Sequence, residues 1–307
     1  MDATRAELRV KDVRYATDVA RRASLTALAS SSLFAAMAMA ARLVSHNIPG
    51  PEVALVRFAA GIAAVLVAFA AFRVDLRPQR WGWLISRGVF GGTAALLYFA
   101  CIAKIGVGMA TLLNYTAPVW SMVFAWFFLR ERPGRHAFVA LPMTLVGVVL
   151  VASARAGTWH FGTWESVAVL SAILSGMAIT SIRATRREGT DGTPSENSWT
   201  VFASFTTLGF FTTLPTVFSP LGRWVSPTAR EWLLLLMCGG LSVVAQLLMT
   251  KALGKLTAVG LGIIQQTTVV LALIGGIAFF GESISARAAA GSIITLAGVV
   301  WSVRSKP

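Results

Sequence analysis

Long apolar segments alternate with short polar connections over almost the whole chain. Each segment has about 17 to 25 mostly apolar residues, the length that an α-helix needs to cross the hydrocarbon core of a bilayer. The pattern predicts ten transmembrane helices and leaves no stretch long enough for a soluble domain. The predicted segments are 24–45, 52–72, 83–104, 107–129, 137–153, 163–183, 198–218, 229–250, 256–280 and 286–303.

The composition favours the same class of protein. Hydrophobic residues make up 56 % of the 307 residues, and charged residues make up only 13 %. Soluble domains carry about 25 % charged residues, so a single water-soluble core cannot bury this much apolar surface. We therefore expect an all-α polytopic membrane protein.

Positive charge gathers in the connections on one side of the predicted bundle. The formal net charge is +14, and with the N-terminus inside the cell most Lys and Arg residues fall in cytoplasmic connections, including Lys251 and Lys255. This is the positive-inside bias of membrane proteins, so the charge reflects topology and not a nucleic-acid site. We expect residues 1–23 and 304–307 to be cytoplasmic, and the protein to lie in a bacterial inner (plasma) membrane.

The chain contains an internal repeat. Residues 144–149 read Thr-Leu-Val-Gly-Val-Val, and residues 295–300 read Thr-Leu-Ala-Gly-Val-Val, 151 positions later. Glu131 returns as Glu282 at the same shift. Such repeats are typical of transporters built from two related halves. The repeat predicts two five-helix units, 24–153 and 154–303.

An odd number of helices in each unit predicts that the second unit is inverted in the membrane. The connection at 130–135 contains three arginines, whereas its counterpart at 281–285 contains no Lys or Arg. A copy placed on the opposite side of the membrane should lose its positive charge in this way. A chance similarity between two Gly/Val-rich helices is the alternative.

Several short motifs recur in both halves. They are Ala110, Pro118-Val119, Leu129-Arg130-Glu131 and Gly147-Val148-Val149, with counterparts at Thr257-Ala258, Phe280-Gly281-Glu282 and Gly298-Val299-Val300, and the pair Arg57-Phe58. In these motifs the chain resembles the EamA family of the drug/metabolite transporter superfamily over residues 24–303. The resemblance implies ten helices in inverted repeats, a central cavity open alternately to each side, and export or exchange of small metabolites. Val269 stands opposite Pro118, and Gly281 opposite Arg130, so two positions depart from a strict repeat.

Ionisable groups avoid the predicted membrane interior. All 13 acidic residues and all 3 histidines lie in connections or at segment ends. Proton relays and intramembrane proteases need such groups at depth. Cys101 and Cys238 lie inside predicted segments without a redox or metal-binding motif. We expect no catalytic residues, no metal site and no cofactor.

Neutral polar residues mark a candidate substrate site. Asn114 and Tyr115 in the fourth segment correspond, at the repeat shift, to Gln265 and Gln266 in the ninth. Polar groups at equivalent places in two repeats are typical of a site near the bilayer midplane. Further candidates for substrate binding are Tyr98, Gln246 and Ser175.

Pro118 adds a backbone group to this site. Proline has no N–H, so the carbonyl of Asn114, four residues earlier, loses its helical partner. A free carbonyl in the membrane needs another partner or a water-lined cavity. The alternative is a packing kink, with the amides bonded to neighbouring helices.

Arg57 is the charged candidate. It lies about one and a half turns into the second segment, where it could contact an anion or carboxylate at the cavity mouth. The alternatives are snorkelling or an ion pair with Glu52. Four other basic residues are nearer to segment ends and are expected to snorkel or to set topology: Arg42, Arg87, Lys104 and Arg183.

Together these features predict a secondary transporter of small organic metabolites that are neutral, zwitterionic or anionic, with amino acids a plausible substrate. Two alternatives stay open: a proton-coupled exporter of cationic drugs or metabolites, and a membrane partner protein that transports nothing. The expected partners are the substrate and membrane lipids, without nucleic acid. The sequence does not fix the oligomeric state.

Overall fold

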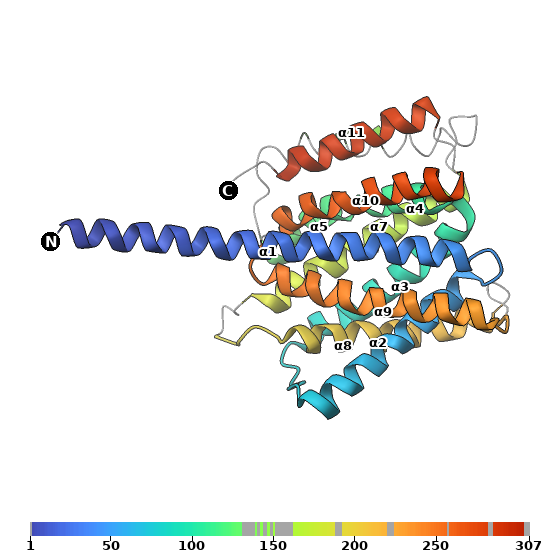
Figure 1. Ribbon diagram of the computed structural model, residues 1–307, viewed down its shortest axis with the longest axis horizontal. Helices are drawn as coiled ribbons and strands as arrows, with labels where there is room; N and C mark the ends of the chain where they lie inside the picture. The colour runs from blue at the N-terminus through green and yellow to red at the C-terminus, as the bar shows by residue number, and fades with distance from the viewer. Residues whose placement is uncertain are drawn as a thin grey trace.

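The regular structure is entirely helical in the part of the chain that is described. The computed structural model describes residues 2–130, 162–187, 192–219, 224–256, 258–281 and 285–303, with single positions between 131 and 161. The helices pack as one bundle (Figure 1). They are α1 (Asp2–Val44), α2 (Gly50–Phe72), α3 (Trp81–Ile105), α4 (Val107–Asn114), α5 (Ala117–Leu129), α7 (Thr163–Arg186), α8 (Ser198–Val217), α9 (Ala229–Leu253), α10 (Ala258–Phe280) and α11 (Ala286–Val303).

The predicted transmembrane segments correspond closely to these helices. Within the described residues, seven helical segments are long and apolar enough to span a membrane: Arg21–Val44, Gly50–Phe72, Trp81–Ile105, Val107–Leu129, Thr163–Arg186, Ser198–Val217 and Ala229–Leu253. Shorter apolar runs lie in α10 and α11. Most of the predicted segment 137–153 falls outside the described residues, and so do Glu131 and Glu282. The all-helical membrane class is therefore confirmed, and the count of ten helices stays a prediction.

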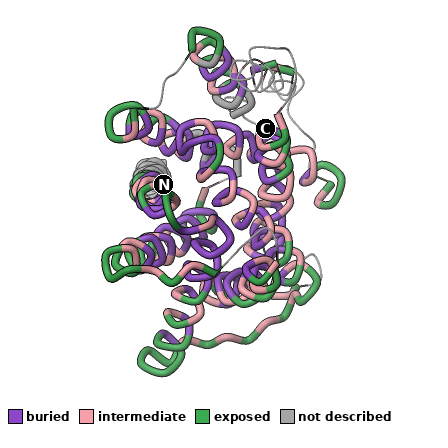
Figure 2. The backbone as a smooth tube through the Cα atoms, turned by 90° about the vertical axis from the view of Figure 1, so that its right-hand side faces the viewer, coloured by how far each residue is buried: buried purple, intermediate pink, exposed green. Residues whose placement is uncertain are grey.

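Large apolar side chains cover the outside of the bundle. Phe72 and Phe279 are each 76 % exposed, and Leu66, Phe127 and Leu233 are also exposed. Figure 2 shows buried residues turned toward the interior and exposed ones at the periphery. Soluble proteins rarely expose so much apolar surface. These side chains are suited to contact lipid tails.

The N-terminal segment joins the first span without a break. Residues 2–23, which we expect to be cytoplasmic, form the first part of α1, which runs from Asp2 to Val44 as one helix. Its first turns project beyond the rest of the bundle (Figure 1).

Helix ends follow local capping chemistry. At the start of α9, the Thr228 hydroxyl accepts from the backbone N–H of Glu231 (3.4 Å), and the Glu231 carboxylate accepts from the backbone N–H of Thr228 (2.7 Å). This reciprocal pair is a capping box. At their other ends, α5 and α10 both stop at a left-handed residue, Arg130 (φ 53°) and Gly281 (φ 62°). These are equivalent repeat positions, which explains why glycine can replace arginine there.

Contacts between the two halves are reciprocal. The packing of α1 on α9 has its counterpart in that of α3 on α7, because each is a first-with-third helix contact between the repeats. In the same way, the contact of α2 with α9 is the counterpart of the contact of α3 with α8. The contact of α1 with α10 is the counterpart of the contact of α5 with α7. The pairs α2 with α8 and α4 with α10 each join equivalent helices. Two halves related by an approximate two-fold axis produce this pattern.

Candidate substrate cavity

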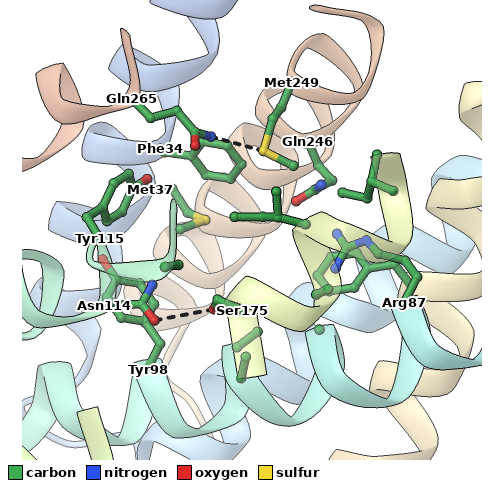
Figure 3. Close-up of a pocket in the computed structure, with 18 of the residues that line it drawn as sticks. Phe34, Met37, Arg87, Tyr98, Asn114, Tyr115, Ser175, Gln246, Met249 and Gln265 are labelled. Carbon is green, nitrogen blue, oxygen red and sulfur yellow. Dashed lines mark hydrogen bonds between the residues drawn. The ribbon is translucent and has the colours of Figure 1, made fainter. Parts of the chain in front are cut away.

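A cavity of about 130 Å³ lies between the two halves. Among the described residues, nine helices contribute to its wall: α1, α2, α3, α4, α5, α7, α8, α9 and α10. Seven of the eight residues that we predicted for substrate binding line it: Arg57, Tyr98, Asn114, Tyr115, Ser175, Gln246 and Gln265. Figure 3 shows several of these side chains around the cavity. Their role in binding remains a prediction.

The helix break at Pro118 shapes one wall. The fourth predicted segment is not a kinked helix but two helices, α4 and α5, separated by Tyr115 and Thr116. The N–H of Tyr115 still donates to Thr111 O (2.9 Å), and that of Thr116 donates to Leu113 O (3.3 Å). The chain then restarts as α5 with Pro118 in its first turn, where proline is tolerated.

Asn114 lies at the end of α4 with a donor free for a ligand. Its side-chain oxygen accepts from the hydroxyls of Ser171 (2.8 Å) and Ser175 (3.4 Å) on α7. The amide nitrogen makes no hydrogen bond to any residue that the structure describes. The serines therefore fix the orientation of the amide and leave its N–H groups for the cavity.

Gln265 and Gln246 contribute two further side-chain amides that lack a strong hydrogen-bond acceptor. The Gln265 amide donates only to the sulfur of Met249 (3.1 Å), a weak acceptor. The Gln246 amide nitrogen is buried without a partner among the described residues. Tyr98, in contrast, already shares a hydrogen bond of 2.8 Å with the Thr111 hydroxyl. The two glutamines are better placed than Tyr98 to bind a ligand.

Gln266 is the one predicted site residue that does not line the cavity. Its amide donates to the carbonyls of Tyr115 (3.4 Å) and Gly262 (3.3 Å). Adjacent residues on a helix point about 100° apart, so Gln265 and Gln266 cannot both face the same space. The side chain instead satisfies a carbonyl that the α4–α5 break exposes, a structural contact between the repeats.

Arg57 is buried inside the protein and does not snorkel. Its side chain is only 5 % exposed, and its guanidinium carbon lies 5.1 Å from the ring centroids of Phe58 and Phe205 and 5.7 Å from that of Phe99. No ion pair joins it to Glu52, whose carboxylate instead accepts from the backbone N–H of Val225 (3.0 Å). Both alternatives weighed for Arg57 are therefore wrong.

Arg87 also lies elsewhere than we predicted. We predicted that it would snorkel near a helix end, but α3 begins at Trp81 and places Arg87 more than one turn inside the helix. It is 5 % exposed, lines the cavity, and stacks on Phe205 at 3.9 Å from the ring centroid. Arg42, also expected to snorkel, donates to the carbonyls of Ile102 (3.3 Å) and Ala103 (3.4 Å) at the end of α3.

Among the described residues, no carboxylate or imidazole lines the cavity. The described residues also contain no group of three or more His, Cys, Asp or Glu that could hold a metal ion. The cavity thus combines neutral amides and hydroxyls, aromatic and methionine surface, and two cations. This chemistry suits reversible binding of a small polar molecule.

Comparison with known proteins identifies the family. The sequence profile of the EamA-like transporter family matches the chain twice, over residues 21–153 and 162–304. The chain belongs to the EamA-like transporter family. The resemblance seen in the sequence is thereby confirmed, and the double match agrees with a chain of two related halves.

Relatives within this group of transporters are distant in sequence. The pseudopaline exporter CntI of Pseudomonas aeruginosa (strain UCBPP-PA14) is 24 % identical over 289 residues, which cover 94 % of this chain and 98 % of the relative. The riboflavin transporter of Vibrio cholerae serotype O1 is 24 % identical over 223 residues, 68 % of this chain and 67 % of the relative. A crystal structure at 20 % identity superimposes with a TM-score of 0.66 over 92 % of this chain and 96 % of its own, so it shares the fold.

Several residues of this EamA-like cavity were not foreseen. Arg87, Phe205, Phe34 and Met37 line it, from α3, α8 and α1. Aromatic and methionine residues in apolar segments give no sequence signal, because they are equally suited to lipid contact or packing. Arg87 carried a signal, since a charge inside a span marks a functional site more often than not.

Proposed function

We propose that this EamA-like protein is a secondary transporter that moves small organic metabolites across the bacterial inner membrane through the cavity between its halves. The halves are two five-helix units, 24–153 and 154–303, inverted relative to each other, with both termini in the cytoplasm. The substrate is neutral, zwitterionic or anionic. No nucleotide-binding loop is present in the sequence, so transport proceeds by facilitated diffusion, exchange or coupling through the substrate.

The observation that carries this proposal is the placement of incompletely satisfied amide donors in a partly open cavity between the halves. Asn114 comes from the first half, and Gln246 and Gln265 come from the second. A ligand bonded to both sides lies where relative movement of the halves changes its access. Amides that served packing alone would be paired with protein acceptors, as the Gln266 amide is with the carbonyls of Tyr115 and Gly262.

Alternating access follows from this geometry. The reciprocal contacts allow two arrangements of similar energy, one open to each side, because each half can take the role of the other. The break between α4 and α5 offers a flexible point beside Asn114. Rocking of the two helix groups around the bound ligand then transfers it without a continuous pore.

Relatives support the general class of substrate. CntI is named as an exporter of pseudopaline, and the Vibrio cholerae relative as a transporter of riboflavin. Each name thus describes the transport of one particular compound. The alternative of a cation exporter driven by protons has less support, since the cavity wall, as far as the structure describes it, contains arginines and no acidic residue.

Counterflow in proteoliposomes tests this function. Vesicles loaded with a candidate metabolite should accumulate the labelled compound, and a pooled metabolite screen from cells identifies the candidates. In the Asn114→Ala/Gln265→Ala double variant, accumulation should fall roughly tenfold or more, the loss expected for two hydrogen bonds to a ligand.

A matched control removes two hydroxyls outside the cavity. Thr26→Ala/Ser166→Ala breaks only local bonds to Arg22 O and Gly162 O, and it should transport like the wild type. Undiminished counterflow by a folded Asn114→Ala/Gln265→Ala protein would contradict the site. Absence of flux for every metabolite in the wild type would instead support a partner protein that transports nothing.

A further inference from the structure

Two arginines that no carboxylate of the described residues neutralises lie in the cavity wall, beside the same phenylalanine. Arg57 comes from α2 and Arg87 from α3, and each is 5 % exposed. Their guanidinium carbons lie 5.1 and 3.9 Å from the centroid of the same Phe205 ring, so the two carbons are no more than about 9 Å apart. Nε and Nη1 of Arg57 and Nε of Arg87 are buried without a partner among the described residues.

This arrangement of two buried cations is unfavourable in free energy unless a ligand occupies the cavity. Like charges repel, and removing a cation from water without a counter-ion is strongly unfavourable. The rings of Phe58, Phe99 and Phe205 attract the flat faces of the guanidinium groups. Ring faces do not accept the N–H groups that point outward in the guanidinium plane. The donors therefore still lack acceptors, which buried polar groups rarely do.

The fold holds Arg87 in this place. A Cβ atom on Gly91, one turn along α3, would collide with Nη1 of Arg87 and come within 3.1 Å of Phe205. Because Gly91 has no side chain, the guanidinium lies against the helix backbone between α3 and α8. Gly91 itself lines the cavity, so the same gap places the charge at the cavity wall.

An oxyanion satisfies both the charge and the free donors. The guanidinium fork binds a carboxylate through two parallel hydrogen bonds. Figure 3 shows Arg87 across the cavity from Asn114, Tyr115 and Gln265, so a bound acid would have neutral polar groups around its other end. A volume of about 130 Å³ is comparable with the ~150 Å³ cavity that accommodates benzene, so the ligand is compact.

We infer that the transported metabolite is a small organic acid with net negative charge, whose carboxylate binds between Arg57 and Arg87. This inference rests on the proposed transport function and narrows its substrate class. A net cation is disfavoured because the described part of the cavity wall has no acidic residue to balance an ammonium group.

A four-carbon series tests the inference on the full-length protein in detergent. Succinate, succinamide and putrescine each have four carbons, but their ends are carboxylates, amides and amines, respectively. The same comparison is then made for acids of two to six carbons and their amides. We expect the unfolding temperature to rise with one or more acids and not with the paired amide or amine. Arg57→Gln and Arg87→Gln should each weaken binding of that acid by about 30-fold or more.

Controls separate charge from fold. Arg77→Gln removes an exposed arginine that pairs only with Asp75 at the surface, and it should bind the acid like the wild type. Gly91→Ala keeps every charge but displaces Arg87, so it should also weaken binding, whereas Gly240→Ala, where a Cβ would meet nothing within 4 Å, should not. Arg87→Lys keeps the charge without the fork, so its binding should fall between those of Arg87→Gln and the wild type.

The outcomes distinguish this inference from the function on which it rests. If the metabolite screen finds a neutral or cationic solute that is moved equally well by the Arg57→Gln/Arg87→Gln protein, the transport function holds and the anion site is wrong. If acids bind in an arginine-dependent manner but no solute moves, the anion site holds and the transport function fails. If no acid binds and none moves, the inference is overturned.

Discussion

The Gln266 amide donates to the backbone carbonyl of Tyr115, the residue that occupies the equivalent position in the first repeat. The two residues are separated by 151 positions, the repeat shift itself. Equivalent residues can touch only close to the axis that relates the halves. The contact therefore marks where α4 and α10 cross, beside the helix break and the cavity.

Replacing Gln266 with leucine should destabilise the protein. The Tyr115 carbonyl would lose its side-chain donor while the volume stays similar, and we expect a loss of about 1 kcal/mol, since the bonds of 3.3 and 3.4 Å are long. Unfolding followed by tryptophan fluorescence in detergent measures the change. A stability equal to that of the wild type would mean that the contact contributes nothing to joining the halves.

Ser171 should act on substrate binding through Asn114. Its hydroxyl lies 2.8 Å from the Asn114 side-chain oxygen and 2.8 Å from Ala94 O. Without it, the Asn114 amide can rotate, so Ser171→Ala should raise KM for counterflow by roughly threefold to tenfold. Ser166→Ala, on the same helix but outside the cavity, is the control. An equal effect of both variants would remove the special role of Ser171.

Removing the charge of Arg57 should not destabilise the protein without ligand. A buried cation that lacks a counter-ion costs free energy, so Arg57→Met should leave the stability unchanged or raise it by about 1–2 kcal/mol. The measurement is the unfolding midpoint in the absence of solutes. A loss of about 3 kcal/mol would show instead that the arginine holds the surrounding rings together.

The helix ends at positions 130 and 281 should respond in opposite directions. Both residues have left-handed backbone, which suits glycine and strains other residues. Arg130→Gly should stabilise the protein by about 0.5–1 kcal/mol, and Gly281→Ala should destabilise it by about 1 kcal/mol. Thermal unfolding of the two variants tests this, and destabilisation by both would mean that Arg130 has a role beyond the cap.

Much of the fold could be predicted from hydrophobic patterns because lipid imposes strict lengths on helices. The prediction of 198–218 corresponds to Ser198–Val217, and that of 286–303 to Ala286–Val303. Most of the candidate site was also predictable, since Asn114 and Gln265 stand at equivalent repeat positions and both line the cavity. Polar side chains are rarely buried within a membrane-spanning bundle unless they have a structural or functional role, so each one in the sequence indicates a candidate site.

The remaining features depend on the direction of side chains, which spacing along the sequence does not fix. Arg87 could snorkel or face inward, and only the packing of α3 on α8 around Gly91 decides between them. Asn114 and Tyr115 both face the cavity because the helix breaks there, whereas the intact α10 lets only Gln265 do so. Pro118 marked the neighbourhood of the break in the sequence, but not that the helix would end at Asn114 and restart at Ala117 instead of kinking.

The central claim is that one cavity opens in turn to the two sides of the membrane. A single cysteine at Ser175, in a protein whose Cys101 and Cys238 are replaced by alanine, tests it with a membrane-impermeant maleimide in oriented vesicles. We predict labelling from either side alone, and slower labelling from both sides when a transported solute is present. Labelling from only one side, in a protein that still performs counterflow, would contradict the account.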